Sequence, residues 1–360
     1  MTFEWDEDRV KAEKDYYLGK LLANHDPKAN RDQNNVDKIK IRIEDSVHVD
    51  AEKGITTVRL PFLEDPVHFF KKHYEGQSSN IQSARKVYLS QCGRNSETKA
   101  AVNKEFQKLQ DLGFLAPLKD APAEIKEAVD KAEFTHYYPW RSVWNDCSLS
   151  TPLRIIVDPS GSLLNVILPK GQGGVSSLHE ILLRSRLGIE ADASDIRKLY
   201  NMLHLDLSSI PYSLVLYHSS LDKDTEPEVF YMRRAWYGVV CVSAQATTAV
   251  RRLAETFQDE FPKGAEALKN SLYVDDLFVT ADSEEERNQI LFEAKEILAK
   301  GGFQLKYEIK SGQAPPSEAS DDGQHVSTLG YRWNTEQDKW SLGVQEINFN
   351  KKDQRCQAAK

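Results

Sequence analysis

The sequence predicts an α+β fold that contains a split β-α-β sheet with helices on one of its faces. The main observation is the order of the predicted elements in the second half of the chain, which runs strand, helix, strand, hairpin, helix, strand. A second is the pair of apolar arms at 271–274 and 277–280, which flank two aspartates and are typical of a β-hairpin. A third is the helical signal over 284–300, which begins behind Asp282 or Ser283 and stops at two glycines. Together they indicate the ferredoxin-like arrangement.

The first half of the chain begins with a polar segment. Residues 1–55 are charged and polar with few aromatic side chains, so we expect an N-terminal extension that is poorly ordered or depends on a partner. Residues 81–112 have helix-like apolar spacing, which predicts two helices. Residues 153–157 are apolar apart from Arg154 and run into an Asp-Pro-Ser-Gly turn, which predicts a strand. A glycine-rich loop follows at 171–174.

The second half begins with a short predicted strand at 187–196, which carries Asp192 and Asp195. The other elements expected there are helical structure over 197–205, a β-rich stretch over 229–242, a helix over 243–261 capped by Ser243, and strands at 303–309 and 326–333.

Length and composition exclude several classes of protein. The chain has 360 residues, of which 40% are hydrophobic, enough to bury a sizeable core. No run approaches the roughly 18 apolar residues of a membrane span, and the first residues are acidic where a secretory signal is basic. We therefore expect an intracellular, cytoplasmic protein that is not secreted and enters no membrane. The 4 cysteines form no CxxC pair and the 9 histidines no HExxH, so neither disulfides nor a zinc site is indicated.

A formal net charge of −8 argues against a simple basic nucleic-acid-binding module, because lysine and arginine supply most non-specific affinity for phosphates. Part of the acidity is local, however, and a metal-dependent enzyme concentrates carboxylates where cations bind. Basic residues that could line a groove lie elsewhere in the chain, at Arg141, Arg154, Lys170, Arg184 and Arg186.

Asp275 and Asp276 are the strongest candidates for chemistry. Two adjacent carboxylates on a tight hairpin repel each other, and a divalent cation is the natural compensation. Mg²⁺ prefers hard oxygen ligands, and three carboxylates can hold two such ions for phosphoryl transfer. Asp195 is the best supplier of the third carboxylate and Asp192 a weaker one. The alternative is an ordinary solvated Asp-Asp turn.

Motifs in the order of a known family surround this hairpin. They are Leu153-Arg154-Ile155-Ile156-Val157-Asp158, Asp195-Ile196-Arg197-Lys198-Leu199-Tyr200, Tyr237-Gly238-Val239-Val240-Cys241-Val242-Ser243, Tyr273-Val274-Asp275-Asp276, Gly301-Gly302-Phe303-Gln304-Leu305-Lys306 and Leu329-Gly330-Tyr331-Arg332-Trp333. In this order the chain resembles the reverse transcriptases of long-terminal-repeat retrotransposons, most closely the BEL/Pao type. The resemblance covers roughly residues 56–344 and implies the fingers and palm of a right-hand polymerase.

The resemblance implies a role for each matching residue. Asp195, Asp275 and Asp276 would be catalytic and hold two Mg²⁺ ions, with Mn²⁺ as a substitute. Arg154 would contact the triphosphate, Tyr200 would exclude the ribose 2′-hydroxyl, and Tyr237 with Gly238 would lie against template and nucleotide. Lys306 would donate a proton to pyrophosphate, with Lys310 as the alternative. The primer grip would comprise Leu329, Gly330, Tyr331 and Trp333.

Some features leave alternatives open or depart from the family. Tyr200 could equally be a core aromatic, and Trp333 an ordinary packing residue. Ala244 stands where a proline is usual, which puts helix entry and template placement in question.

The resemblance also implies an organisation and partners. Residues 56–190 would form the fingers and the start of the palm, 191–345 the palm, and 346–360 the truncated start of a thumb or connection. The partners would be an RNA/DNA template-primer duplex and deoxynucleoside triphosphates. A protease, an RNase H and an integrase accompany such polymerases, and none is recognisable here. One rival interpretation is a catalytically weak or inactive relic that acts as a nucleic-acid or protein interaction module. Another is an unrelated phosphotransfer enzyme such as a nucleotide cyclase.

Overall fold

The computed structural model describes residues 42–144, 153–171, 177–320 and 322–341. Its α-helices are α3 Pro66–His73, α4 Ile81–Cys92, α5 Ser96–Asp111, α6 Ala123–Asp130, α7 Leu178–Arg184, α8 Val242–Thr256, α9 Pro262–Asn270 and α10 Glu284–Ala299. Its strands are β1 Val47–Asp50, β2 Ile55–Val58, β3 Leu115–Pro117, β4 Trp140–Trp144, β5 Leu153–Val157, β6 Glu190–Asp195, β7 His204–Leu205, β8 Leu214–Tyr217, β9 Glu228–Met232, β10 Leu272–Tyr273, β11 Asp276–Ala281, β12 Ile309–Lys310, β13 His325–Thr328, β14 Tyr331–Asn334 and β15 Lys339–Ser341.

The central feature is a four-stranded sheet with the order β10-β11-β6-β12. The three neighbouring pairs are all antiparallel. In chain order the strands and their helices run β6, α8 with α9, β10, β11, α10, β12, so the sheet has the split β-α-β topology that the sequence predicts. The chain is therefore a mixed α+β protein.

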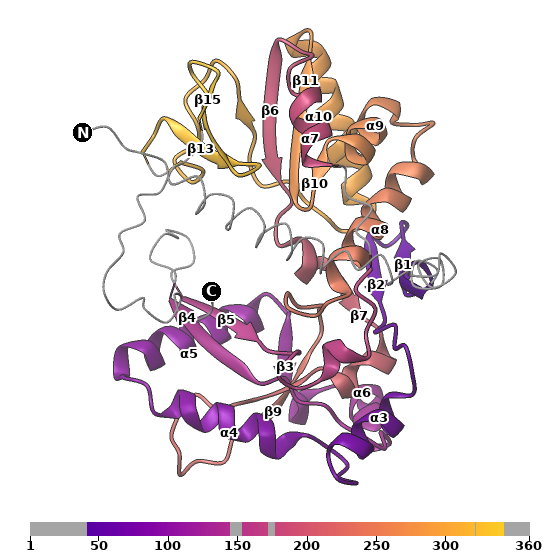
Figure 1. The fold of residues 1–360 in the computed structure, drawn as a ribbon, viewed down its shortest axis with the longest axis vertical. Coiled ribbons are helices and arrows are strands. Elements are labelled where there is room, and N and C mark those ends of the chain that lie inside the picture. The colour runs from indigo at the N-terminus through magenta and orange to yellow at the C-terminus, as the bar shows by residue number, and fades with distance from the viewer. Residues whose placement is uncertain (1–41, 145–152, 172–176, 321, 342–360) are drawn as a thin grey trace, which may run out of the picture.

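The two faces of this sheet are covered differently. Leu277 and Val279 of β11 belong to the main hydrophobic core together with residues of α8, α9 and α10. Phe278 lies on the other face, in a second, smaller core with Ile181 of α7 and Trp333 of β14. Figure 1 shows the small sheet of β13 to β15 beside β6, away from α9 and α10. The alternation of β11 side chains between two cores accounts for its almost continuous apolar sequence.

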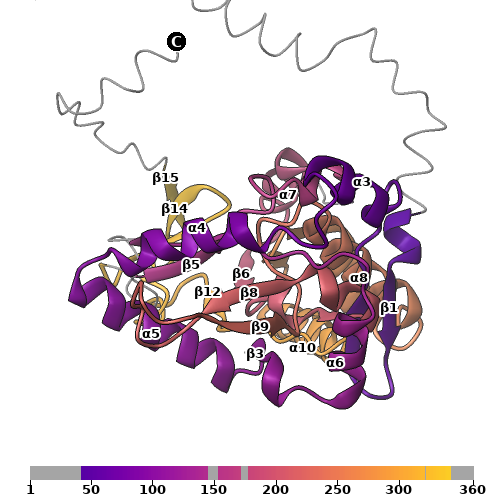
Figure 2. The same ribbon diagram turned by 90° about the horizontal axis from the view of Figure 1, so that it is seen from below.

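The other half of the molecule is built around the sheet β3-β9-β8 and the ribbon β4-β5. Figure 2 shows α4 and α5 on either side of these strands. Aromatic side chains hold this part together: Phe106 of α5 stacks on Tyr217 at 3.8 Å between ring centroids and meets Trp140 edge-on at 4.9 Å. The main core is continuous between the two halves. The helices that the sequence predicts over 81–112 are present as α4 and α5.

A third sheet, β1-β2-β7, corrects the expectation for the start of the chain. Residues 42–55 were predicted to belong to a polar extension, but β1 pairs with β2 and buries Val47, and Ile43 before it is also buried. These apolar residues join the main core, which outweighs the polar composition around them. Residues 1–41, the predicted start of a thumb at 346–360, and most of the 171–174 loop lie outside the described residues.

Other differences concern the lengths and ends of elements. Helical structure over 197–205 is reduced to a 3₁₀ turn at Leu199–Met202, because β7 follows directly and pairs with β2. The predicted 243–261 helix is α8, whose N-cap is Cys241, so Ser243 lies inside the first turn and does not cap it. A separate helix, α9, follows and was not predicted. The strand predicted at 303–309 shortens to β12.

Two further findings bear on composition. Cys92 and Cys241 are buried free thiols, and Cys147 and Cys356 lie outside the described residues. Within the described ranges, none of the helices combines the length and apolar character needed to cross a membrane.

The contact between α9 and α10 depends on Gly264. A Cβ at this position would stand 2.4 Å from the backbone nitrogen of Ala294, so the helices approach here without room for a side chain. The Gly264 N–H donates to Oε2 of the buried Glu293 at 2.8 Å. Since α9 leads directly into β10, this contact positions the hairpin that carries Asp275 and Asp276.

We predict that Gly264→Ala destabilises the protein by about 2–3 kcal/mol, the range expected for overpacking a tight contact. The exposed Glu266→Ala on the same helix is the control and should change the free energy of unfolding by less than about 1 kcal/mol. Urea unfolding of both variants measures the difference. Equal stability of the two variants would show that the helices separate without cost.

Candidate active site

The register of β11 against β6 places two of the predicted carboxylates opposite each other. Asp276 pairs with Asp195 across these antiparallel strands. Paired residues direct their side chains to the same face of a sheet, with Cβ atoms about 5 Å apart. The N–H of Ile196 donates to the carbonyl of Asp275 at 2.8 Å, which extends the pairing as far as the turn. The three aspartates thus come together at the ends of two neighbouring strands.

The turn between β10 and β11 is strained. Tyr273 pairs with Asp276, so Val274 and Asp275 form a two-residue hairpin loop. Val274 has a φ of 59°, in the left-handed region that a β-branched residue rarely adopts. Such strain costs on the order of 1–3 kcal/mol and persists where the surrounding structure enforces it. Here the pairing of β11 with β6 enforces it.

The electrostatics of the aspartates are unfavourable without a cation. Burial, followed by the charges of Asp275 and Asp195, raises the pKa of Asp276 to about 6. Burial and then the charge of Asp195 also raise the pKa of Asp275. The Lys306 ammonium acts in the opposite direction on both groups. The site therefore holds more negative charge than its surroundings compensate.

Lys306 supplies a positive charge next to Asp195. Its Nζ lies 2.5 Å from Asp195 Oδ2, and its backbone N–H donates to the Asp195 carbonyl at 2.9 Å. The other carboxylate oxygen, Asp195 Oδ1, is buried and has no hydrogen-bond partner. Lys310, the alternative in the sequence, pairs with Asp192 in the register of β12 and contacts Glu308 at 3.1 Å. It therefore belongs to the opposite face of the sheet.

A second hairpin contacts the aspartates. Leu329 and Gly330 connect β13 to β14 and have φ values of 51° and 79°. The backbone N–H of Leu329 donates to the Asp276 carboxylate, which lowers the pKa of that group. Tyr331 is partly exposed and meets the ring of Trp340 edge-on at 6.1 Å between centroids.

Trp333 differs from the expected contact with a primer. Its side chain is fully buried, stacks on Trp340 at 5.5 Å and meets Phe278 of β11 edge-on at 5.6 Å. Its Nε1–H donates to Asp338 at 2.8 Å. The ring therefore packs inside the smaller core in this structure.

The carboxylate oxygens of the aspartates are ligands that a divalent cation prefers, but the side chains are not arranged as a complete metal site. Across the described ranges, no group of three or more His, Cys, Asp or Glu side chains is placed to hold a metal ion. The donors are nevertheless all carboxylate oxygens, and Asp195 Oδ1 lacks any partner. The raised pKa values of Asp275 and Asp276 reflect the same shortage of positive charge. The residues therefore fit a hard cation such as Mg²⁺.

Arg154, Tyr237 and Gly238 form a separate group at the end of the β4-β5 ribbon. The Tyr237 hydroxyl donates to the carbonyl of Ile155 at 2.8 Å, and the charge of Arg154 acts on Tyr237, whose pKa burial raises to about 12. Gly238 has a φ of 99°, and a Cβ there would stand 3.2 Å from the Val157 carbonyl oxygen. The positive φ and the nearby Val157 carbonyl both favour glycine at this position. The side chain of Arg154 is exposed.

Tyr200 follows Asp195 in the chain and contacts α8. Its hydroxyl is 3.4 Å from Oγ of Ser243, and its ring packs partly against the main core. Ala244, in the first turn of α8, is buried. The helix begins without the usual proline, because alanine is itself a strong helix former.

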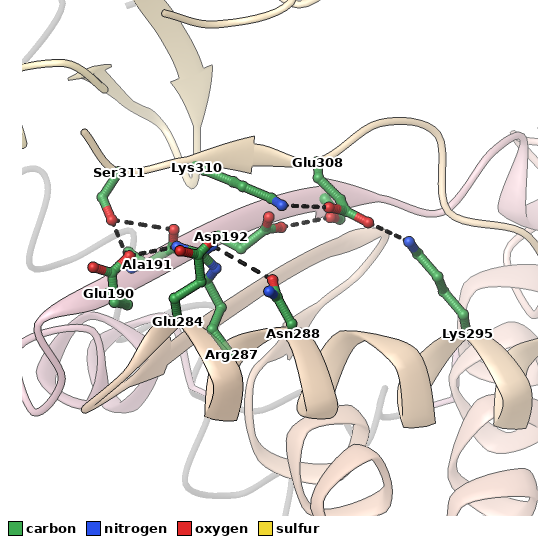
Figure 3. Close-up of polar contacts among 11 residues, drawn as sticks. Glu190, Ala191, Asp192, Glu284, Arg287, Asn288, Lys295, Glu308, Lys310 and Ser311 are labelled. Atoms are coloured by element: carbon green, nitrogen blue, oxygen red, sulfur yellow. Dashed lines mark hydrogen bonds and ion pairs between the residues drawn. The ribbon is translucent and has the colours of Figure 1, made fainter. Parts of the chain in front are cut away.

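A polar network lies on the helix-facing side of β6, behind Asp195. Asp192 is fully buried; its Oδ1 accepts from Ser194 Oγ at 2.7 Å, while Oδ2 has no partner. Figure 3 shows this network between β6 and β12 on one side and α10 on the other. The contacting residues are Glu190, Glu284 and Asn288 around the buried Arg287, and Lys295 and Lys310 around Glu308. The network ties β6 to its neighbours and fixes the strand that carries Asp195.

Sequence reasoning missed some residues of the site. Asn165 bridges the loop before α8, since its Nδ2 donates to the Gly238 carbonyl at 2.8 Å and its Oδ1 accepts from Val240 N–H at 3.0 Å. Tyr307 lies close enough to Asp195 and Asp276 for their charges to raise its pKa further, after burial has done so. Leu329 contributes through its backbone alone. Every residue type except proline has a backbone N–H, so the sequence gives no signal for this contact.

Comparisons with known proteins identify no family for the chain. No family model matches the chain, and no curated protein matches it. Among solved structures it is similar to a prototype foamy virus protease-reverse transcriptase, with 16% sequence identity and a TM-score of 0.45. The match covers 69% of this chain and 26% of the foamy virus chain, so this chain spans about a quarter of that protein's length. At this TM-score the similarity carries no argument about activity.

We predict that Asp192→Asn stabilises the protein at pH 8. Burial raises the pKa of Asp192 to about 7 from 3.8. The folded state therefore binds a proton more tightly than the unfolded state, and stability is lost as the pH rises from about 4 through 7. Asparagine removes that loss, which is on the order of 4 kcal/mol at pH 8, because the pKa rises by about three and each step of one corresponds to about 1.4 kcal/mol.

The measurement is urea unfolding at pH 8 and pH 5.5, with the exposed Asp130→Asn as the control. The gain from Asp192→Asn should shrink at the lower pH, and the control should show no such trend. A gain that is the same at both pH values would mean that the buried charge is not its cause.

Proposed function

We propose that the chain is an RNA-directed DNA polymerase of the reverse-transcriptase type, related to the BEL/Pao long-terminal-repeat retrotransposons that its motifs resemble. The observation that supports this most directly is the pairing of Asp195 with Asp276 across β6 and β11, with Asp275 beside them in the turn. Such a set of carboxylates at the end of two strands suits phosphoryl transfer. The reaction would join the primer 3′-oxygen to the α-phosphorus of a deoxynucleotide and release pyrophosphate.

Asp195, Asp275 and Asp276 would hold Mg²⁺, with Mn²⁺ as a substitute. When bound, the two ions would supply positive charge for the attacking and leaving oxygens. Asp195 Oδ1, which is buried and has no hydrogen-bond partner, is an oxygen whose missing partner a bound ion would supply. The strained Val274 turn and the Leu329 N–H orient the other carboxylates before any substrate arrives.

Other residues of the chain would bind and orient the nucleotide. The exposed Arg154 guanidinium offers a bidentate contact to triphosphate oxygens. The Tyr200 ring, anchored near Ser243, would exclude a 2′-hydroxyl. Lys306, which pairs with Asp195, would donate a proton to the leaving pyrophosphate. The partners would be a template-primer duplex of RNA and DNA, and protease, RNase H and integrase domains would act with the polymerase in an intracellular setting.

One observation favours a second candidate, a polymerase-like chain with little or no activity. In the described part of the chain no three carboxylates are arranged so that they could hold a metal ion, and Lys306 already neutralises Asp195. Such a chain would act as a nucleic-acid or protein interaction module. Incorporation of deoxynucleotides on a primed homopolymer RNA, with Mg²⁺ or Mn²⁺, distinguishes the two candidates. The identity of the product also distinguishes a polymerase from a cyclase.

We predict that Asp276→Asn lowers primer extension by a factor on the order of 10³ or more, the scale on which lost electrostatic stabilisation acts. Asp282→Asn is the matched control, because it removes the same charge from an exposed position at the far end of β11. It should leave extension within about twofold of the unsubstituted chain. Full activity of the Asp276→Asn variant would rule out the proposed catalytic carboxylates.

We also predict that Lys306→Met strengthens Mg²⁺ binding about fivefold in the absence of nucleotide, because a partly exposed ion pair contributes about 1 kcal/mol that an incoming cation must displace. The same substitution should raise the pKa of Asp276 above about 6, since Lys306 lowers it. Calorimetric titration and carboxyl-carbon NMR measure the two effects.

Lys310→Met is the control for this experiment, because its ammonium contacts Glu308 on the helix-facing side of the sheet. It should leave both quantities unchanged. If the two lysine variants bind Mg²⁺ equally, Lys306 does not compete with the metal.

A further inference from the structure

Arg234 stands out among the described residues as a half-buried cation without a partner. Its Nε and Nη1 are buried and make no hydrogen bond, and no ion pair involves it. Burial and the neighbouring Arg233 both lower its pKa, to about 10, and no acidic group acts in the other direction. A buried guanidinium is normally paired, because desolvation of an unpaired charge is costly.

The backbone brings His204 beside it. His204 and Arg234 form an antiparallel bridge. The flanking hydrogen bonds run from Leu205 N–H to the Arg233 carbonyl at 3.0 Å and from Ala235 N–H to the Leu203 carbonyl at 2.9 Å. The bridged pair is therefore of the non-hydrogen-bonded type, in which side chains approach most closely, with Cα atoms about 4.5 Å apart. Two basic side chains are thus directly opposite on one face.

The same row continues onto the next strand. Thr57 of β2 pairs with His204 of β7, so its hydroxyl lies on the face that carries the imidazole. The alternate residues Thr56 and Val58 are buried on the other face, which confirms the direction of the Thr57 side chain. Three donor groups, a hydroxyl on β2, an imidazole on β7 and the guanidinium of the residue bridged to β7, therefore lie on neighbouring segments about 5 Å apart.

Among the described residues, no acidic side chain balances this row. Burial, Arg234 and Arg233 together lower the pKa of His204 to about 4, and no carboxylate raises it. His204 is therefore neutral at pH 7, and it can take up a proton beside the Arg234 guanidinium only when an anion offsets that charge. This is notable in a chain whose net charge is −8.

We propose that Arg234, His204 and Thr57 form a binding site for a phosphate group, distinct from the aspartate site. Guanidinium forks match the oxygens of phosphate in a bidentate manner, and hydroxyl and imidazole donors can serve its remaining oxygens. The phosphate belongs either to the backbone of a nucleic-acid strand or to a free phosphate or pyrophosphate.

The test is a calorimetric titration of the full chain with inorganic phosphate at pH 7 and constant ionic strength, without divalent metal or nucleotide. Arg234→Gln should weaken binding by a factor of about ten or more, the effect of losing a charge-assisted bidentate contact. Arg94→Gln is the matched control, because Arg94 is exposed and its side chain makes no ion pair in the described structure; it should leave affinity within about twofold. Absence of phosphate binding, or equal binding by both variants, would overturn the proposal.

Two further measurements keep the test decisive if Arg234→Gln folds poorly. Thr57→Val keeps the size of the side chain and removes only the hydroxyl, so it should weaken phosphate binding several-fold. NMR of the imidazole carbons should show that saturating phosphate raises the pKa of His204 from about 4 by a unit or more, because a bound anion stabilises the protonated ring. An unchanged His204 would place the bound phosphate elsewhere.

A single-stranded oligonucleotide distinguishes the two sources of the phosphate. If it displaces inorganic phosphate and shifts the His204 signals, the site binds a nucleic-acid backbone. If only phosphate and pyrophosphate do so, the site binds free anions. Asp276→Asn should bind phosphate normally in either case, so failure of the proposed polymerase activity and failure of this site are distinguishable.

Discussion

The structure around the aspartates depends on one constraint, the register that sets Asp276 opposite Asp195. Two carboxylates at this separation repel each other, and burial adds to the cost of ionising them. The chain counters part of this cost with the Lys306 ammonium and the Leu329 N–H. The register itself is held by packing at a distance from the charges, through α9 against α10 and through Phe278 against Trp333. A one-residue slip of either strand would move its aspartate to the helix-covered face and separate the pair, so the register is strongly specified.

β6 directs polar side chains to both faces of the sheet, and the two sets lie in different surroundings. Ala191, Ala193 and Asp195 face the smaller core and the open site, whereas Glu190, Asp192 and Ser194 face α10. On the helix side, the buried Arg287 pairs with Glu190 and Glu284. Asp192 remains incompletely satisfied within that network. The rigidity of β6 therefore comes from a buried polar network, which is sensitive to ionisation in a way that an apolar core is not.

Lys306 and Arg234 are basic side chains in opposite surroundings: Lys306 pairs with a carboxylate, and Arg234 has none among the described residues. Lys306 is matched to a carboxylate that it must release if a metal is to bind there. Arg234 has no carboxylate at all and shares its face with His204 and Thr57. The overall charge of −8 therefore says little about how the chain meets phosphates. The positions of a few cations determine where the chain could bind phosphate, because charges more than a Debye length apart are screened from each other.

The sequence by itself determined the order of the strands in the four-stranded sheet along the chain, the β10-β11 hairpin with its two aspartates, and the helices α4, α5 and α10, since apolar periodicity and helix-end signals are local. It also favoured Asp195 as the third carboxylate, and the family resemblance pointed to Lys306 with Lys310 as the alternative. Only the tertiary structure decided that Asp195 rather than Asp192 faces Asp276, that Trp333 is buried, and that residues 47–50 form a strand. It alone revealed the Leu329 contact and the unpaired Arg234. These features depend on which face a residue takes and on what packs against it, and both are set by segments far apart in the chain.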